Sequence, residues 1–330
     1  MTWGPVILRR VLAASLLCAG LSQPVLAQGQ GGPGVGGLGG KVFRIVIPGA
    51  PGGPGGVIVH LLANKLQIHL KETVIVEYKP GAGGNIAEEY VAKSAPDGTT
   101  MLFTIPAVVT NPFFQKHALE PDVLAPIIQL NSGPFALLVN PRSDMKTGAD
   151  VVAKIRAAPG TVGCNVGAVA TATVSCYQLQ AYAGPMLFVA YQGGAQGLAA
   201  LERGEIQTAF DFTSSSAGAV REGRLRAVAL TSKEPASGDF KGVPPLADTI
   251  PGFEIIGWQG IGVTKGTPHE IVMKLNEAFN KVLAEDEVKE FMRKGNLELI
   301  GGTPEAFGAR IKRDYAFYGK VAKDNKIEPQ

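Results

Sequence analysis

The chain has 330 residues, 45% of them hydrophobic and 18% charged, a composition that supports folded cores and excludes disorder for the bulk of the chain. Its 31 Lys and Arg residues against 28 Asp and Glu residues leave a net charge of +3, too small for the basic face of a nucleic-acid-binding domain. Four His and three Cys residues are too few and too scattered for a zinc cluster, so we expect neither a metal nor a cofactor.

Residues 1–27 have the pattern of an export signal. Arg9 and Arg10 precede an apolar run over 11–21 that is too short to span a bilayer, and residues 25–27 form a small-residue cleavage motif. We therefore expect cleavage after Ala27 and a periplasmic protein. Residues 28–41 are predicted to be a flexible Gly-rich linker, because eight of the twelve residues from 29 to 40 are Gly.

From residue 42 the chain alternates strand and helix patterns. Apolar runs predict strands over 42–47, 74–78 and 100–104, and helical spacing predicts helices over 57–70 and 85–94. Strand–helix–strand alternation requires right-handed crossovers, so the fold class is α/β with a largely parallel sheet.

The rest of the chain repeats the alternation. Strands are predicted over 135–140, 161–166, 187–191, 206–210, 225–231 and 260–263, and helices over 148–158, 173–183 and 195–203. Two closing helices begin near Thr267 and Thr303, and Thr267 has capping-box spacing to Glu270. This count fits two α/β lobes better than one sheet. We assign 42–138 plus 254–330 to lobe one and 139–253 to lobe two.

Cys164 and Cys176 remain after removal of the signal, in a compartment where thiols can oxidise. A disulfide between them requires suitable geometry, and two small buried thiols are an equal alternative.

Catalytic motifs are missing from the sequence. It has no G-x-S-x-G elbow, no G-x-x-x-x-G-K-[ST] loop and no H-E-x-x-H, and no His has a neighbouring carboxylate pattern. No nucleophile–base pair is discernible. We therefore expect no enzyme, and a secreted enzyme acting on a small acid is the weakest alternative.

Two Gly-rich turns each follow a predicted strand and precede a predicted helix. Residues 48–56 are Pro-Gly-Ala-Pro-Gly-Gly-Pro-Gly-Gly, and residues 79–85 are Lys-Pro-Gly-Ala-Gly-Gly-Asn. Glycine lets a ligand approach the main chain, and a helix N-terminus offers free N–H groups at a positive dipole end. Side by side at the carboxyl ends of parallel strands, the two turns predict an anion site. The alternative is that they are only tight turns.

The order of these motifs resembles the solute-binding receptors of tripartite tricarboxylate transporters, the Bug family. The resemblance rests on Ile-Val-Ile-Pro-Gly-Ala-Pro-Gly-Gly at 45–53, Val-Glu-Tyr-Lys-Pro-Gly-Ala-Gly-Gly-Asn-Ile at 76–86 and Ala-Pro-Asp-Gly-Thr-Thr-Met-Leu at 95–102, and it extends from 42 to 327. It implies a two-lobed periplasmic-binding-protein-like fold, each lobe a mainly parallel sheet flanked by helices, with the ligand cleft between the lobes.

The same resemblance implies a function. The protein would capture a small organic mono- or dicarboxylate and deliver it to membrane permease subunits; the alternative is a periplasmic ligand sensor for a signalling partner. We expect a monomer.

The resemblance also implies ligand-binding residues in both lobes. In lobe one they are Ala50, Pro51, Gly52, Gly53, Pro54, Gly55, Gly81, Ala82, Gly83, Gly84 and Asn85, and in lobe two they are Gly167, Ala168, Val169, Ala170, Thr171, Thr173, Asp211 and Phe212. Thr171 and Thr173 suit a helix N-cap that could hold a second carboxylate, and their alternative role is only to cap that helix.

The chain departs from the family pattern near the first turn. The family usually has Thr-Asp where this chain has Gly55-Gly56, and Arg where it has His60. The missing Asp removes an acceptor, so we expect a ligand without an ammonium group. We also expect a Cβ added at Gly83 to project toward the bound carboxylate or to force the turn out of a positive-φ conformation.

Overall fold

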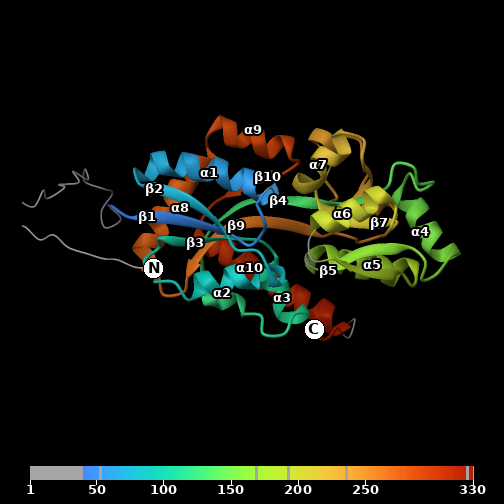
Figure 1. Cartoon of the computed structure of the whole chain (residues 1–330), viewed down its shortest axis with the longest axis horizontal. Helices are drawn as coiled ribbons and strands as arrows, with labels where there is room; N and C mark the ends of the chain where they lie inside the picture. Colours follow the sequence, from blue (N-terminus) through green and yellow to red (C-terminus); the bar gives the residue numbers. More distant parts are fainter. Residues whose placement is uncertain are drawn as a thin grey trace, which may run out of the picture. The chain divides into compact units, whose positions relative to one another are not determined.

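The computed structural model describes residues 40–51, 54–167, 170–191, 194–234, 237–324 and 327–329. The predicted export signal and residues 28–39 of the predicted linker lie outside the described residues. The described segments belong to one compact unit, along which strands and helices alternate (Figure 1). None of the described helices is long and apolar enough to cross a membrane.

The first sheet has the strand order β2-β1-β3-β9-β4, with β10 paired to β4. Its strands are β1 (Val42–Ile47), β2 (Thr73–Tyr78), β3 (Thr100–Thr104), β4 (Leu124–Val139), β9 (Ile256–Thr264) and β10 (Glu298–Gly301). β1 is parallel to β2 and β3, whereas β9 is antiparallel to both β3 and β4. A strand from late in the chain therefore lies in the middle of this sheet.

Helices cover both faces of the first sheet. One face carries α1 (Pro54–Leu70), α8 (His269–Leu283) and α9 (Asp286–Lys294); the other carries α2 (Asn85–Ala92), α3 (Ala107–Phe114) and α10 (Pro304–Asp324). Because successive strand residues face opposite sides, Ile45 packs toward α1 while Val46 packs toward α2, and both are fully buried. Burial on both faces explains why these strands are continuous apolar runs in the sequence.

The second sheet has the order β4-β7-β5-β6, with β8 also paired to β4. Its further elements are β5 (Gly163–Gly167), β6 (Leu187–Tyr191), β7 (Thr208–Phe212), β8 (Arg226–Leu230), α4 (Gly148–Ala157), α5 (Ala170–Ala183), α6 (Gly194–Arg203) and α7 (Thr213–Arg221). Short 3-10 helices occur at Ala82–Gly84 (η1), Pro121–Val123 (η2), Gly238–Phe240 (η3) and Leu246–Asp248 (η4).

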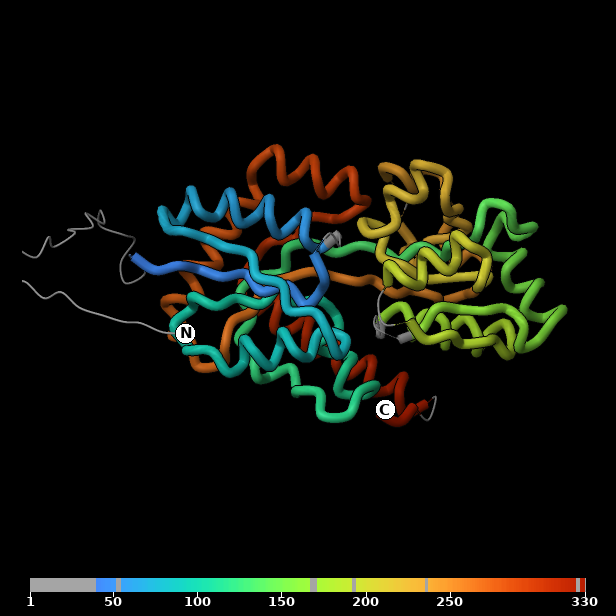
Figure 2. Tube along the Cα trace, viewed as in Figure 1, coloured from blue at the N-terminus to red at the C-terminus, as the bar shows by residue number. Residues whose placement is uncertain are grey.

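Strand β4 belongs to both sheets. Pro134 pairs with Ile256 in the first sheet, and the next residue, Phe135, pairs with Phe212 in the second. We call the first sheet with α1–α3 and α8–α10 lobe one, and the second sheet with α4–α7 lobe two. Figure 2 shows both ends of the described chain, blue and red, in lobe one and the green and yellow middle in lobe two. The predicted boundary after residue 138 stays a prediction.

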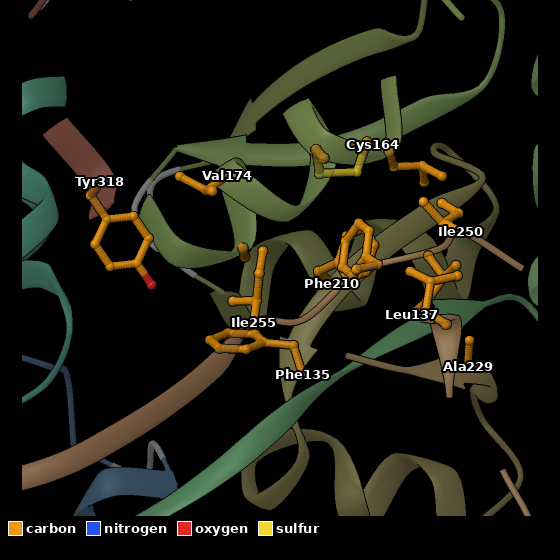
Figure 3. Packing of buried hydrophobic residues seen from close by; sticks show 14 of the residues in the cluster. Phe135, Leu137, Cys164, Val174, Phe210, Ala229, Ile250, Ile255 and Tyr318 are labelled. Carbon is orange, nitrogen blue, oxygen red and sulfur yellow. A yellow bond between two sulfur atoms is a disulfide. The ribbon is translucent and has the colours of Figure 1, made fainter. Parts of the chain in front are cut away.

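The largest hydrophobic core extends through both lobes. It contains Val108 and Val109 of α3, and it continues through Phe135 and Phe210 into lobe two, whose part is seen in Figure 3. Trp258 of β9 is buried in this core. The cores beneath α1 and α8 and beneath α6 and α7 are separate from it. The lobes are therefore joined by apolar packing, mainly through this core and also through Phe212, which packs against the core beneath α1 and α8.

Cys164 of β5 and Cys176 of α5 form a disulfide bond, which decides between the two alternatives left open by the sequence (Figure 3). Both side chains are fully buried. The bond closes a covalent ring that contains the turn from β5 into α5, so the start of α5 is tied to its sheet.

The structure corrects two sequence predictions at element ends. Thr267 forms no capping box with Glu270: its hydroxyl donates to the Thr264 carbonyl at 2.8 Å, and α8 begins without a side-chain cap. The strand predicted over 135–140 is the last part of β4, which begins at Leu124.

Candidate functional site

The strands of the two lobes point toward each other along β4. β3 runs in the direction of β4, because both are antiparallel to β9, whereas β7 runs against β4. β3 ends at Thr104, which pairs with Gly260 of β9, and Gly260 pairs in turn with Gln129 of β4. β7 ends at Phe212, which pairs with Phe135 of β4. The six residue steps along β4 from Gln129 to Phe135 span roughly 20 Å. The carboxyl ends of the two groups of parallel strands therefore face each other at a separation that suits a small molecule.

The first Gly-rich turn leads from β1 into α1, and two glycines let the start of α1 lie close to the sheet. A Cβ on Gly55 would lie 3.1 Å from a ring carbon of Phe103, and one on Gly56 would lie 2.7 Å from the Tyr78 hydroxyl. Close packing therefore requires glycine at 56. The first N–H groups of α1 have no partner within the helix and remain available to a ligand.

Tyr78 and His60 form a pair beside this helix start. Tyr78 Oη and His60 Nε2 are 2.9 Å apart, and the two rings are 6.0 Å apart. The Tyr78 hydroxyl thus occupies the space beside position 56, where the family pattern has an Asp. This pair is not visible in the sequence, because the two residues lie on different elements.

The second Gly-rich turn has four consecutive residues in positive-φ conformations, Gly81 to Gly84, with φ of 126°, 45°, 58° and 107°. Positive φ at Gly83 and Gly84 confirms that part of the prediction. A Cβ on Gly83 would lie 2.1 Å from Gln115 Nε2, and the expectation that it would also face the ligand stays a prediction. A Cβ on Gly84 would lie 3.3 Å from Pro48 Cβ, so the two Gly-rich turns are packed against each other.

A network of side-chain amides holds the second turn on α3. Asn111 Nδ2 donates to the Gly83 carbonyl at 3.1 Å and to Asn85 Oδ1 at 2.7 Å. Asn85 Nδ2 in turn donates to Gln115 Oε1 at 3.0 Å. The Asn85 side chain, predicted to bind ligand, therefore positions the turn; its main-chain N–H belongs to the start of α2.

In lobe two, the predicted turn before α5 is only partly described. Ala168 and Val169 lie outside the described residues, as do Gly52 and Gly53 of lobe one. Gly167 ends β5, and α5 begins at Ala170. Thr171 and Thr173 are buried, and both have partners: the Thr171 side chain interacts with the Tyr318 hydroxyl, and Thr173 also makes an interaction.

The predicted residues Asp211 and Phe212 end β7. Phe212 packs its ring 5.4 Å from that of Phe135 and lies at the N-cap of α7, where no side-chain cap is present. Asp211 is 8% exposed, and its Oδ2 has no hydrogen-bond partner. Burial raises the pKa of Asp211 to about 7, partly offset by a hydrogen bond from the Phe212 N–H.

Helices of the two lobes touch at this place, because α1 contacts α7 and α3 contacts α5. The described residues contain no cluster of three or more His, Cys, Asp or Glu that could hold a metal ion. None of the predicted ligand-binding residues is Lys or Arg. Helix N-termini and hydroxyls are therefore the groups at this place that suit an anion.

A cavity of about 600 Å³ lies elsewhere, between α10, β10 and residues 254–256. Much of its polar lining is already paired: Arg310 Nε donates to Asp314 at 2.7 Å, the Ser132 hydroxyl donates to Glu298 at 3.2 Å, and Glu254 pairs with Lys233 outside the cavity. The cavity contains none of the predicted ligand-binding residues. We therefore take the facing strand ends, with their helix starts, as the candidate site.

Comparison with known proteins gives consistent matches along the chain. The sequence profile described as "Tripartite tricarboxylate transporter family receptor" matches residues 58–317. A UPF0065 protein of Cupriavidus necator is 31% identical over 297 residues, covering 88% of each chain. Protein BugT of Bordetella pertussis is 27% identical over 307 residues, covering 89% of this chain and 90% of its own.

Solved structures show the same fold. The periplasmic binding protein BugD has a TM-score of 0.80 and 25% identity, over 88% of this chain and 99% of its own. An R. palustris protein solved with adipate has a TM-score of 0.80 and 26% identity, over 87% of this chain and 98% of its own. The predicted two-lobed α/β fold class is thus confirmed.

Proposed function

Because the chain belongs to the tripartite tricarboxylate transporter receptor family, we propose that it is a receptor that binds a small organic carboxylate between its two lobes and delivers it to the permease subunits of such a transporter. The family is one of receptors, and the chain matches its profile over most of its length. We propose three things beyond family membership: the class of ligand, the residues that bind it and the permease partner.

The observation that supports this function most directly is the arrangement of four helix starts. α1 and α2 of lobe one, and α5 and α7 of lobe two, each begin just beyond a strand whose carboxyl end faces the other lobe. The first turn of each helix has N–H groups without an intrahelical partner and about half a positive charge from the helix dipole, although at α2 the first of these groups, the Asn85 N–H, donates to the Ala82 carbonyl. Four such starts suit an anion that reaches both lobes.

Two further observations support a carboxylate without an ammonium group. The R. palustris neighbour was solved with adipate, an aliphatic dicarboxylate. In this chain the Tyr78 hydroxyl, which is hydrogen-bonded to His60, occupies the space beside Gly56. A hydroxyl can donate to a carboxylate, and unlike the Asp of the family pattern it brings no negative charge to attract an ammonium group.

The disulfide supports function outside the cytoplasm. Disulfide bonds persist in oxidising compartments such as the periplasm and are rare in the cytosol. The bond between Cys164 and Cys176 is therefore consistent with the export signal predicted from residues 1–27.

A thermal-shift series tests the proposal. The mature protein is heated with succinate, glutarate, adipate or pimelate, and with hexane-1,6-diol as a matched neutral control. A ligand at a hundredfold excess over its Kd adds about 2.7 kcal/mol to stability, which raises the Tm measurably. We expect at least one acid to raise the Tm, no effect of the diol, and unchanged ligand by NMR after incubation. No shift with any of the four acids would contradict the proposal, and conversion of the ligand would show an enzyme.

A further inference from the structure

We propose that Arg310, Asp314 and Tyr318 of α10 are positioning residues, which hold lobe two against lobe one in the arrangement that binds the ligand. The inference rests on the proposed function for its effect on affinity, and it concerns residues outside the predicted ligand-binding set. It gives the last helix of lobe one a role in fixing the other lobe.

The three residues form a polar row along α10. They are four and eight positions apart, so their side chains leave the helix on one side. Asp314 and Tyr318 are buried, and Arg310 is largely covered. The helix itself packs on β4 and α3 of lobe one. The row is therefore anchored in lobe one.

Arg310 binds the chain where it passes from lobe two into lobe one. The Ile255 N–H donates to the carbonyl of Thr231, which follows β8 of lobe two, at 3.1 Å, and the Thr231 hydroxyl donates to the Ile255 carbonyl at 2.5 Å. The next carbonyl, that of Ile256 at the start of β9, accepts from Arg310 Nη2 at 2.8 Å. Two consecutive carbonyls of this crossing are thus held by different lobes.

Asp314 orients Arg310 and adds a second bond to β9. Its Oδ2 accepts from Arg310 Nε at 2.7 Å and from Trp258 Nε1 at 2.8 Å. Hydrogen bonds to charged groups are stronger than neutral ones, and a buried polar network whose members are paired specifies one arrangement of its elements. The carboxylate therefore keeps the guanidinium directed at the crossing.

Tyr318 reaches lobe two directly. Its hydroxyl is hydrogen-bonded to the side chain of Thr171 in the first turn of α5, and both residues are buried. The disulfide between Cys164 and Cys176 ties α5 to its own sheet. A shift of α5 relative to α10 is therefore a shift of lobe two, and the bond to Tyr318 opposes it.

The cavity of about 600 Å³ lies along the same row. Arg310, Asp314 and Tyr318 line it, together with Ile255 and Ile256 of the crossing. Side-chain packing thus leaves space between α10 and the crossing, and hydrogen bonds make the connection there. This space lets the lobes shift when one of the bonds is removed.

Tyr318→Phe tests the row by removing one oxygen atom. Spin labels on Ala153→Cys of α4 and Ala284→Cys, directly after α8, report the distance between the lobes, because both positions are exposed. We expect Tyr318→Phe to broaden the distribution of this distance in the mature, ligand-free protein. Tyr315→Phe is the matched control on α10, because the Tyr315 hydroxyl donates to Glu120 Oε2 at 2.6 Å within lobe one. An unchanged distribution in Tyr318→Phe, or equal broadening in both variants, would overturn the assignment.

Thr171→Val removes the same bond from the side of lobe two. In ligand-free protein it should broaden the distribution as much as Tyr318→Phe does, and the double variant should broaden it no further, because one bond is lost only once. Additive broadening in the double variant would overturn the assignment. This second variant keeps the test independent of the folding of Tyr318→Phe.

Calorimetry connects the row to ligand binding. For the acid that raises the Tm most, Tyr318→Phe should weaken the affinity about three- to tenfold, and Tyr315→Phe should change it less than twofold. Unchanged or increased affinity in Tyr318→Phe would overturn the positioning role while leaving the receptor function intact. A wild type that binds none of the acids would overturn the receptor function and, with it, the effect on affinity. The distances in ligand-free protein would still support or overturn the bond between the lobes.

Discussion

Replacement of Asp211 by Asn should change how the stability of the ligand-free protein depends on pH. In the folded protein the pKa of Asp211 is about 7 because the carboxyl is buried. In the unfolded chain an Asp ionises with a pKa of about 3.9. The unfolded state therefore releases its proton first, and ionisation favours unfolding.

The size and sign follow from these two values. The contribution of Asp211 is near zero below about pH 4, becomes more unfavourable as the pH rises, and levels off above pH 7 at about 4 kcal/mol. Between pH 5 and pH 8 the change is about 2–3 kcal/mol. Asn cannot ionise. The free energy of unfolding of Asp211→Asn, relative to that of the wild type, should therefore increase by this amount between pH 5 and pH 8. For a protein of this size the gain is several degrees in Tm.

Urea unfolding at pH 5, 6, 7 and 8 measures the effect, with the disulfide intact and no ligand present. Asp248 is exposed on η4, so Asp248→Asn is a matched control that should follow the wild type at every pH. If Asp211→Asn also stayed parallel to the wild type from pH 5 to pH 8, the reasoning from burial would be refuted.

Three further predictions concern stability. Reducing the bond between Cys164 and Cys176, which are 12 residues apart, should lower the free energy of unfolding by about 3 kcal/mol, as measured by urea unfolding with and without dithiothreitol; an unchanged midpoint would contradict this. Gly83→Ala should lower the free energy of unfolding by about 2–3 kcal/mol, because the residue has a φ of 58° and its Cβ would meet Gln115, just after α3. Gly223→Ala, with a φ of 70° and open space around its Cβ, should lower it by only about 1 kcal/mol. Equal losses in the two variants would show that Gln115 moves aside at no cost. The Tm of Glu88→Gln should rise relative to that of the wild type as the pH increases from 5 to 8, because burial raises the pKa of Glu88 to about 8. Parallel pH profiles of the two Tm values would exclude this.

Much of the strand arrangement could be predicted because buried strands are apolar runs bounded by turn residues. The strands over 100–104 and 187–191 match the structure at both ends. The first half of β4 was missed, because Pro126, Gln129 and Asn131 interrupt its apolar pattern. Helix α3 was missed as well, since Pro112 lies inside it. Such elements form because neighbouring strands and cores hold them, which a local pattern does not record.

The candidate site was predictable in its main-chain part and not in its side-chain part. Repeated glycines after strands mark helix starts, so both Gly-rich turns were found. The contact that requires glycine at 83 comes from Gln115, and the hydroxyl beside Gly56 comes from Tyr78, both on other elements. The Thr213 hydroxyl is buried without a hydrogen-bond partner. The sequence does not reveal this, because a Thr directly after a strand is common. Three-dimensional neighbours, and not residue types, distinguish these positions.

The central position of β9 constrains the order in which the chain can fold. Until residues 256–264 are available, β3 and the first half of β4 have no strand between them, and each presents an unpaired edge. The strands that pair with residues 135–139 of β4, by contrast, are β7 and β8, and the whole second sheet beside β4 comes from residues 163–230. Contacts between distant parts of a sequence form slowly. Lobe two should therefore acquire hydrogen-exchange protection first during refolding, with lobe one open to aggregation or chaperone binding until the last third of the chain joins it.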